Sequence, residues 1–268
     1  LFWARHVELR RIGLVDLTGR HPSPGTLREL CALSEVLLDA VLDVSIAEVL
    51  DAGEYKLGGD PREHLGVIGM GKLGAGALNY ASDLDLVFAY DPGAFDDAGT
   101  AQGFYSKVVR KVLNLLGSSG ERGKLYDVDM RLRPRGGAST LAVTLDELER
   151  YLSTEAGFWE RLAACRARVM NPDAPAGILA QRIFDSFVYG GESDARQTRE
   201  MRERLEKESP RNALKRGPGG TLDIEFLLAH LQLKHAAQIP ALRQPDLWEV
   251  LEVAREHGLV DERSHDAI

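Results

Sequence analysis

An apolar segment that opens onto a glycine-rich loop constrains the fold of this chain more than any other feature. Residues 65–69 read as a short buried strand, and the loop 69–74 follows with the spacing GxGxxG. A second predicted strand, residues 83–90, comes soon afterwards. By pattern alone, a strand followed by these glycines suggests a dinucleotide-binding βαβ unit.

Two observations argue against such a unit. The acids Asp83 and Asp85 precede the apolar run of their strand, whereas the ribose-binding acid of a dinucleotide fold lies at the end of the second strand. Only the eight residues 75–82 separate the glycine loop from Asp83, which is too few for a crossover helix and its return connection. The loop is therefore not predicted to bind a dinucleotide.

The acids themselves suggest a metal site. Asp83 and Asp85 lie two residues apart on a strand, so both side chains project from the same face. Two carboxylates held close together repel each other unless a cation lies between them, and the usual cation is divalent with oxygen ligands. A third acid, Asp129, lies on a further predicted strand, residues 125–132. Three carboxylates on neighbouring strands can hold two Mg²⁺ ions, as phosphoryl-type transfer requires.

An isolated Asp-x-Asp pair is more often part of a solvated edge strand. The glycine loop favours the metal site, because Gly71 lies twelve residues before Asp83. A loop so placed can present backbone N–H groups and Lys72 to a triphosphate. On the strand of Asp129, Arg131 and Arg133 are expected to share its face, where each would bind phosphate or pair with a carboxylate.

Composition excludes several classes of protein. The 33 Lys and Arg against 41 Asp and Glu give a net charge of −8, which argues against a duplex-binding surface and predicts no nucleic-acid partner. No apolar run of about 18 residues and no signal-peptide order are present, so no membrane association is predicted. The two cysteines lack CxxC spacing, suit a reducing cytoplasm and are expected to be buried. The first and last residues resemble the ends of a fragment excised from a longer protein.

The coarse organisation is helical, then mixed, then helical again. We predict a helical lead-in over 1–58, an α/β core over 59–172 and a C-terminal helical domain over 173–268, and hence an α+β fold. A helix of about 25 residues is expected after Ser23, which would be its N-cap, and a second helix is expected to end at Gly117. A third begins with a capping box of Thr144 and Glu147 and is expected to run at least to Trp159. Four more helices are expected near 175–188, 193–208, 223–236 and 245–257.

Several motifs in order carry a family resemblance. The main segments are 69–74, 78–86 and 126–134, with further matches at 159–161, 166–168 and 219–226. Together they resemble the bacterial glutamine synthetase adenylyltransferases and adenylyl-removing enzymes, which belong to the DNA polymerase β nucleotidyltransferase superfamily. The resemblance spans roughly residues 60–240. It implies a polymerase-β-like core with a small mixed sheet, followed by a helical bundle that is shorter here than in relatives.

The resemblance also implies roles for individual residues. Asp83, Asp85 and Asp129 match the metal-binding catalytic acids of the family, and Gly71, Lys72 and Ser82 fall where superfamily members hold the phosphates of the nucleotide. One departure is Ala77, which stands where the family usually has an acid; it predicts a lost hydrogen bond or an altered activity.

Asp223 and Glu225 match acids of a further family segment and could face the active site from the helical domain. At positions i and i+2 of a helix, at most one of them is expected to point inward. The alternative role for Asp223 is that of a helix N-cap. Among other residues, Arg166 and Arg168 are predicted to be structural ion-pair partners, and Trp159 is predicted to lie in the core.

Full-length relatives carry two such units, one that adenylylates a tyrosine of glutamine synthetase and one that removes the AMP by phosphorolysis. Segments 137–141, 199–204 and 223–225 favour the adenylylating half, whereas Met130 is more typical of the removing half. The predicted function is therefore transfer of AMP from ATP to glutamine synthetase with Mg²⁺, and a PII-type signalling protein is the expected partner of the full-length enzyme. The alternatives are AMP removal and a catalytically silent nucleotide-sensing module, against which the intact acids argue.

Overall fold

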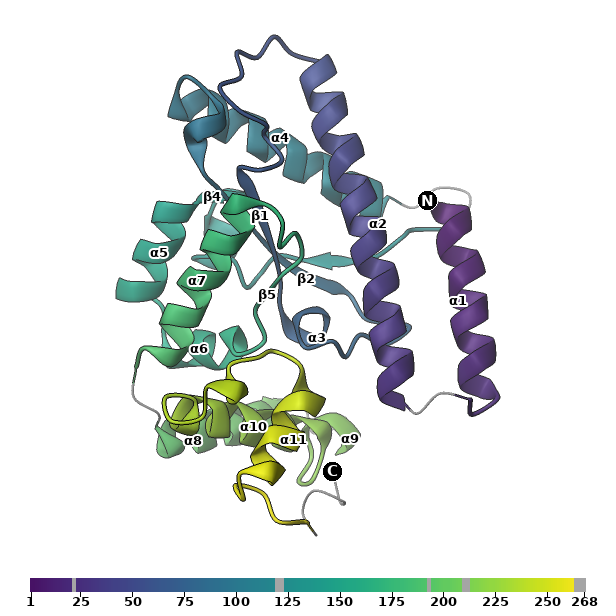
Figure 1. Ribbon diagram of the computed structural model, residues 1–268, viewed down its shortest axis with the longest axis vertical. Coiled ribbons are helices and arrows are strands. Elements are labelled where there is room, and N and C mark those ends of the chain that lie inside the picture. Colours follow the sequence, from purple (N-terminus) through teal and green to yellow (C-terminus); the bar gives the residue numbers. More distant parts are fainter. Residues whose placement is uncertain (21–22, 119–122, 192–193, 209–212, 263–268) are drawn as a thin grey trace. The chain divides into compact units, whose positions relative to one another are not determined.

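The computed structural model describes residues 1–20, 23–118, 123–191, 194–208 and 213–262 (Figure 1). The chain divides into two compact units. The first comprises Leu1–Glu155 and Ala167–Ile183, and the second comprises Ala156–Arg166 and Phe184–Ile268. This division does not show which segments fold on their own. The predicted division into three parts, with boundaries after residues 58 and 172, therefore stays a prediction.

A small mixed sheet forms the centre of the first unit. Strands β1 (Leu65–Gly69) and β2 (Leu84–Tyr90) pair antiparallel along the whole of β1. The free edge of β1 pairs antiparallel with β5 (Arg168–Val169). On the other edge, β3 (Val128–Asp129) and β4 (Val143–Thr144) both run parallel to β2, near its beginning and its end respectively. The predicted strands at 65–69 and 83–90 are confirmed.

One face of this sheet is covered by long helices. These are α1 (Phe2–Leu17), α2 (Ser23–Asp51) and α4 (Ala98–Gly117), and α2 packs against both of the others. The alternating residues Leu84, Leu86 and Phe88 of β2 belong to the same buried cluster as the inward faces of α2 and α4. Because side chains alternate along a strand, Asp85 projects from the opposite face. The long helix after residue 23 is confirmed, whereas the predicted N-cap side chain of Ser23 lies outside the described residues.

The opposite face is covered by the beginning of α7 (Pro175–Tyr189). A Cβ atom added at Gly66 of β1 would lie 2.9 Å from the carbonyl oxygen of Ala176, so only glycine permits this close approach. Helix α5 (Leu145–Thr154) begins as predicted, with the Thr144 side chain accepting a hydrogen bond from the backbone N–H of Glu147 at 3.1 Å.

The prediction that this helix runs to Trp159 is wrong. Helix α5 ends at Thr154, and a separate helix, α6 (Phe158–Ala164), begins in the second unit. Gly157 is the extended N-cap of α6, and its N–H donates to the Glu160 carboxylate at 2.7 Å. Trp159, predicted to be core, stands in the first turn of this helix with 45% of its surface exposed.

The prediction of a strand over residues 125–132 is also largely wrong. Only Val128–Asp129 is a strand. Before it, the N–H groups of Leu125 and Tyr126 both donate to the carbonyl oxygen of Leu116, at the end of α4. After it, the N–H of Arg131 donates to the Asp129 carboxylate at 2.8 Å and the chain turns. Arg131 and Arg133 therefore do not share a strand face with Asp129.

Short helical turns complete the first unit. They are α3 (Gly71–Gly74), directly after β1, and two 3₁₀ turns, η1 (Pro92–Ala94) and η2 (Gly136–Ala138).

The described part of the second unit is helical. Besides α6 and the end of α7 it contains α8 (Ala195–Glu208), α9 (Ala213–Arg216), α10 (Thr221–His235), η3 (Pro240–Leu242) and α11 (Leu247–Glu256). Residues of α10 and α11, together with Leu242, form its core. Gln232 is buried there and donates to the carbonyl oxygens of Leu242 and Gln244 at 2.9 and 2.6 Å. The four predicted C-terminal helices are confirmed, and so is the α+β fold with helices before and after a small mixed sheet.

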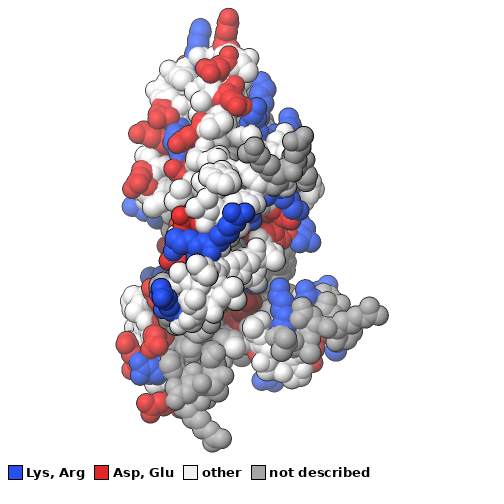
Figure 2. Space-filling model, turned by 90° about the vertical axis from the view of Figure 1, so that its right-hand side faces the viewer, with Lys and Arg blue, Asp and Glu red and all other residues white. Residues whose placement is uncertain are grey.

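The structure confirms the burial of the two cysteines that composition predicted. Cys31 and Cys165 are both buried and free, and burial raises the pKa of the Cys165 thiol to about 12. No helix within the described ranges is long and apolar enough to cross a membrane. On the face that Figure 2 shows, basic and acidic side chains are interspersed. The predicted absence of nucleic-acid binding stays a prediction.

Candidate active site

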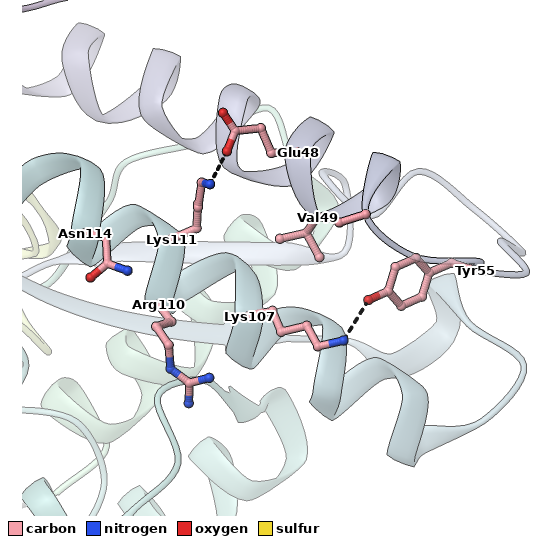
Figure 3. Close-up of a pocket in the computed structure, with 8 residues that line it drawn as sticks. Glu48, Val49, Tyr55, Lys107, Arg110, Lys111 and Asn114 are labelled. Atoms are coloured by element: carbon pink, nitrogen blue, oxygen red, sulfur yellow. Dashed lines mark hydrogen bonds and ion pairs between the residues drawn. The ribbon is translucent and has the colours of Figure 1, made fainter.

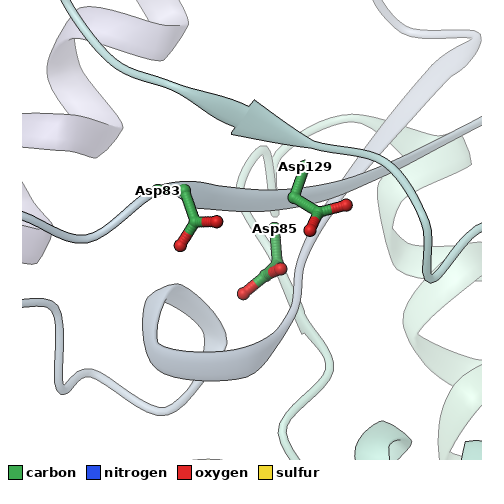
Figure 4. A group of neighbouring side chains, drawn as sticks. All are labelled: Asp83, Asp85 and Asp129. Atoms are coloured by element: carbon green, nitrogen blue, oxygen red, sulfur yellow. The ribbon is translucent and has the colours of Figure 1, made fainter.

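Three carboxylates converge at the beginning of β2. Asp85 and Asp129 are paired residues of the parallel strands β2 and β3, which places their side chains next to each other. Asp83 immediately precedes β2 and lies on the same side as Asp85. Each of the three offers one oxygen atom, and these oxygens all lie within 4.8 Å of one another (Figure 4). The structure thus brings together the three acids that the sequence singled out.

An arginine lies at the edge of this cluster. The Arg131 guanidinium forms an ion pair with Asp129, with Nε at 2.7 Å from Oδ2, and Arg131 remains 85% exposed. Hydrogen bonding to Arg131 lowers the pKa of Asp129 despite its partial burial. The ion pair with Arg131 therefore favours the ionised form of Asp129.

The glycine loop is packed directly against these acids. The N–H of Met70 donates to the carbonyl oxygen of Asp85 at 2.9 Å. At the next residue, Gly71, the backbone is left-handed with φ +54°, and an added Cβ atom would lie 2.3 Å from Asp85 Oδ2. A side chain at residue 71 is excluded both by its backbone conformation and by the carboxylate, so glycine is required for the loop to reach the acids.

The other predicted phosphate-binding residues flank the acids in sequence. Lys72 lies half-buried in α3 and forms no ion pair within the described part of the chain. Ser82 closes a turn immediately before Asp83: its hydroxyl donates to Asn79 Oδ1 at 2.8 Å and accepts from the Asn79 N–H at 3.1 Å. Ala77 contributes only its backbone, with its N–H donating to the Lys72 carbonyl oxygen at 2.9 Å.

Asp223 and Glu225 belong to the second unit, where arginines hold both of them. Arg202, only 9% exposed, forms an ion pair with Asp223, whose other oxygen accepts from the Gly219 N–H at 2.6 Å. Glu225 pairs with Arg166 at 3.0 Å, and both side chains are largely buried. The N-cap role for Asp223 is wrong, because α10 begins at Thr221 with Gly220 as its N-cap.

The ion-pair roles predicted for Arg166 and Arg168 are confirmed. Arg168 of β5 pairs with Glu35 of α2 at 2.6 Å. It also donates to two carbonyl oxygens of the glycine loop, those of Leu73 and Gly74, each at 3.1 Å. Sequence reasoning missed this second contact. No local signal could reveal it, because Arg168 and Gly74 are 94 residues apart in the chain.

The family model for glutamate-ammonia ligase adenylyltransferase matches residues 3–183, which is more than half of the chain. The chain belongs to this family. Glutamate-ammonia ligase is the enzyme also called glutamine synthetase, so the resemblance read from the motifs is confirmed. The adenylyltransferase family is one of nucleotidyltransferase enzymes, and the mixed sheet that carries the acids is consistent with a core of that kind. The matched residues include the three acids and the glycine loop but neither Asp223 nor Glu225.

A separate hollow of about 260 Å³ lies between α2 and α4 (Figure 3). Basic side chains line it, but Lys111 is paired with Glu48, and Lys107 donates to the Tyr55 hydroxyl at 3.2 Å. Lys107 and Arg110 are exposed, and solvated cations of this kind bind anions weakly. None of the predicted site residues lines this hollow.

Proposed function

We propose that this member of the adenylyltransferase family transfers AMP from ATP to a tyrosine hydroxyl of glutamine synthetase, at the site formed by Asp83, Asp85 and Asp129. The observation that carries the proposal is the convergence of these three carboxylates, within 4.8 Å of one another, beside a left-handed glycine. Acids that repel one another are kept close where a cation will share them.

The donor set fits Mg²⁺. All three ligand groups are carboxylates, the hard oxygen donors that Mg²⁺ prefers, and they come from adjacent strands that fix their spacing. When bound, two Mg²⁺ ions would neutralise the phosphates and stabilise the pyrophosphate as it departs. Asp83, Asp85 and Asp129 are the residues that would hold them.

The glycine loop is proposed to bind the phosphates of ATP. The first N–H groups of any helical turn lack intrahelical acceptors, and in α3 these groups follow Gly71 directly. Lys72 would add a positive charge, and Ser82 would contribute its hydroxyl or the shape of the turn it closes. Groups placed in this way would hold the phosphates in a fixed position for attack by the incoming hydroxyl, and such positioning lowers the barrier to reaction.

The reaction forms a bond between the tyrosine oxygen and the α-phosphorus and breaks the bond to pyrophosphate, while the hydroxyl proton passes to a base. Asp129 is the proposed base. Arg131 makes it a weaker base by lowering its pKa. We therefore propose that Arg131, being highly exposed, moves from Asp129 to the phosphates when ATP binds.

Further parts of the function concern partners. One of Asp223 and Glu225 is proposed to face the active site from the helical unit, which would require it to exchange its arginine for a substrate contact. A PII-type protein is proposed as a regulator through the full-length enzyme. A cytoplasmic location is proposed as well, consistent with the two free cysteines.

A second candidate is removal of AMP from adenylylated glutamine synthetase by phosphorolysis. Met130, next to the third acid, is more typical of the removing half, and Ala77 replaces an acid that the family usually has. The same three acids would serve phosphorolysis, which breaks the bond between AMP and tyrosine that the transfer reaction forms. A catalytically silent sensing module is less well supported, because none of the three acids is replaced.

The test is to incubate the chain with ATP labelled in the α-phosphate, Mg²⁺ and glutamine synthetase. We expect label on glutamine synthetase, and no label with folded Asp83→Asn. A parallel reaction presents adenylylated glutamine synthetase and phosphate. ADP formation only in this second reaction would replace the proposed direction with AMP removal, and no product in either would contradict the enzymatic assignment.

A further inference from the structure

The turn that carries the proposed phosphate-binding groups is too short to hold its own shape. Helix α3 has four residues, and an isolated single turn is unstable because nucleation fixes several residues for one hydrogen bond. Its position must come from contacts at its two ends. At the first end, the Met70 N–H is bound to the Asp85 carbonyl oxygen, next to the acids.

At the other end the contact comes from β5. Arg168 pairs with Gly69, the last residue of β1, so its side chain starts beside the beginning of the loop. Its Nε donates to the Gly74 carbonyl oxygen and a terminal nitrogen donates to the Leu73 carbonyl oxygen, both at 3.1 Å. These are the last two carbonyls of α3, where an arginine at the C-terminal end can bind. The Leu73 carbonyl oxygen also accepts from the Gly76 N–H at 3.3 Å.

The guanidinium is itself held from a third element. The terminal nitrogen that binds Leu73 also forms the 2.6 Å ion pair with Glu35 of α2. A guanidinium is a rigid planar fork with five N–H donors, so one group can bind two carbonyls and a carboxylate at fixed angles. A lysine ammonium at the same position would be a single point charge on a flexible stem.

We propose that Arg168 is a positioning residue of the nucleotide site. It fixes the C-terminal end of the glycine loop, so that the N-terminal end of the loop stays against Asp85, and Glu35 fixes Arg168 in turn. That the site binds a nucleotide rests on the proposed function, whereas the effect of Arg168 on the position of the loop does not. A consequence is that the position of the loop depends on α2, a helix that contributes no predicted site residue.

The experiment compares Arg168→Met with a matched control, Arg62→Met. Arg62 also forms ion pairs with α2, to Asp39 and Asp43, and is similarly exposed, at 23% against 31% for Arg168. Among the described residues, Arg62 forms no hydrogen bond to the glycine loop. Both variants and wild type are measured for MgATP dissociation constant, KM for ATP, kcat, and amide hydrogen exchange of residues 74–77 without ligands.

We expect Arg168→Met to weaken MgATP binding and raise KM by roughly tenfold, with a smaller change in kcat, since binding is lost in ground and transition states alike. Exchange at the amides of residues 74–77, each of which donates a hydrogen bond within the turn, should become faster by a similar factor. Arg168→Lys should be intermediate, and Arg62→Met should leave both properties near wild type.

A double-variant cycle keeps the test decisive if Arg168→Met folds poorly. Glu35→Gln, a milder change, should shift binding and exchange in the same direction by a smaller factor. If Glu35 acts through Arg168, adding Glu35→Gln to Arg168→Met should produce little further change. Unchanged loop exchange and MgATP affinity in Arg168→Met, or equal effects of Arg62→Met, would overturn the proposal. A wild-type chain that transfers no AMP would overturn the proposed function instead, while exchange and binding would still decide the role of Arg168.

Discussion

Each unit of the molecule holds acids that were predicted to belong to the site, but the arginines around these acids are arranged differently. In the second unit, Asp223 and Glu225 each have an arginine of their own, Arg202 and Arg166, both largely buried. In the first unit, the carboxylates of Asp83, Asp85 and Asp129 lie within 4.8 Å of one another, and the exposed Arg131 pairs with Asp129.

This difference supports the different roles proposed for the two sets of acids. Charges that are balanced within the chain stabilise or orient the fold, and removing one partner leaves the other uncompensated. Carboxylates held close together on neighbouring strands favour a cation that they can share. We therefore propose that the first set, Asp83, Asp85 and Asp129, forms the metal site, and that the second set, Asp223 and Glu225, mainly stabilises the second unit while substrate is absent.

The largest expected effect is on catalysis by the first set. Replacing Asp83 or Asp85 by Asn should lower AMP transfer by about a thousandfold or more, as expected when a metal-binding carboxylate is lost. Without metal ions, the unfolding free energy of Asp83→Asn should stay the same or rise by up to about 1 kcal/mol, because a like-charge repulsion is relieved. Label transfer and chemical denaturation measure the two quantities.

Asp129→Asn is the informative comparison for that result. It should also abolish transfer, but it removes the partner of Arg131 and so should give no gain in stability. Near-normal transfer by folded Asp83→Asn would remove the distinction between the two sets.

The next effect tests the close approach of the loop to the acids. Gly71→Ala places a Cβ atom where Asp85 Oδ2 now lies and strains a backbone with φ +54°. We expect AMP transfer to fall by about a hundredfold and stability by roughly 1–2 kcal/mol. Gly103→Ala is the control, because an added Cβ there meets nothing within 4 Å in the exposed part of α4. Equal transfer by the two variants would contradict the assigned geometry.

In the second unit the larger effect should be on stability. Arg202→Met removes the partner of Asp223 and the donor to the carbonyl oxygens of Arg216 and Gly217. We expect a loss of roughly 2–4 kcal/mol in unfolding free energy, with metal affinity unchanged. The control is Arg196→Met, whose exposed pair with Glu200 on the same helix should contribute less than about 0.5 kcal/mol. A small effect at Arg202, or weakened metal binding, would show that the second set is not simply structural.

The smallest effect concerns the exposed ion pairs of Glu155 with Arg135 and Arg150. Hydrogen bonds from Arg135 and Arg150 lower the pKa of Glu155 to about 2, from an ordinary value of 4.5. Since the folded-state pKa is the lower one, the stabilisation is present above pH 4.5 and is lost as pH falls towards 2. Glu155→Gln should flatten the dependence of stability on pH in that range, and high salt should reduce the difference. Glu149→Gln, an exposed change on helix α5, which ends just before Glu155, should leave the dependence as in wild type.

Local patterns predicted the framework of the fold well. The runs that became β1 and β2, the stop of α4 at Gly117 and the start of α5 at Thr144 all depend on neighbours in sequence. The prediction of a strand over 125–132 was largely wrong because backbone N–H groups of this segment bind other partners than a strand. Those of Leu125 and Tyr126 donate to the end of α4, and that of Arg131 donates to the Asp129 side chain. The helix expected to reach Trp159 failed because Gly157 and Glu160 start a new one.

The acids of the site could be named from sequence because the spacing of Asp83 and Asp85 defines a face without reference to the rest of the fold. Their approach to Asp129 could only be guessed, since it depends on the pairing of β2 with β3. The arginines were the least predictable. Arg131 binds Asp129 because the chain turns between them, not because the two residues share a strand face. Arg168 binds the glycine loop although it lies 94 residues after Gly74 in the sequence.

Direct measurement of metal binding tests the central claim most plainly. Mn²⁺ is titrated, with electron paramagnetic resonance detection, into wild type and into Asp83→Asn/Asp85→Asn in the presence of a non-hydrolysable ATP analogue. We predict two bound ions per wild-type chain, and an affinity weakened by about tenfold or more for at least one ion in the double variant. Equal stoichiometry and affinity in the two proteins would contradict the assignment of these acids as the metal site.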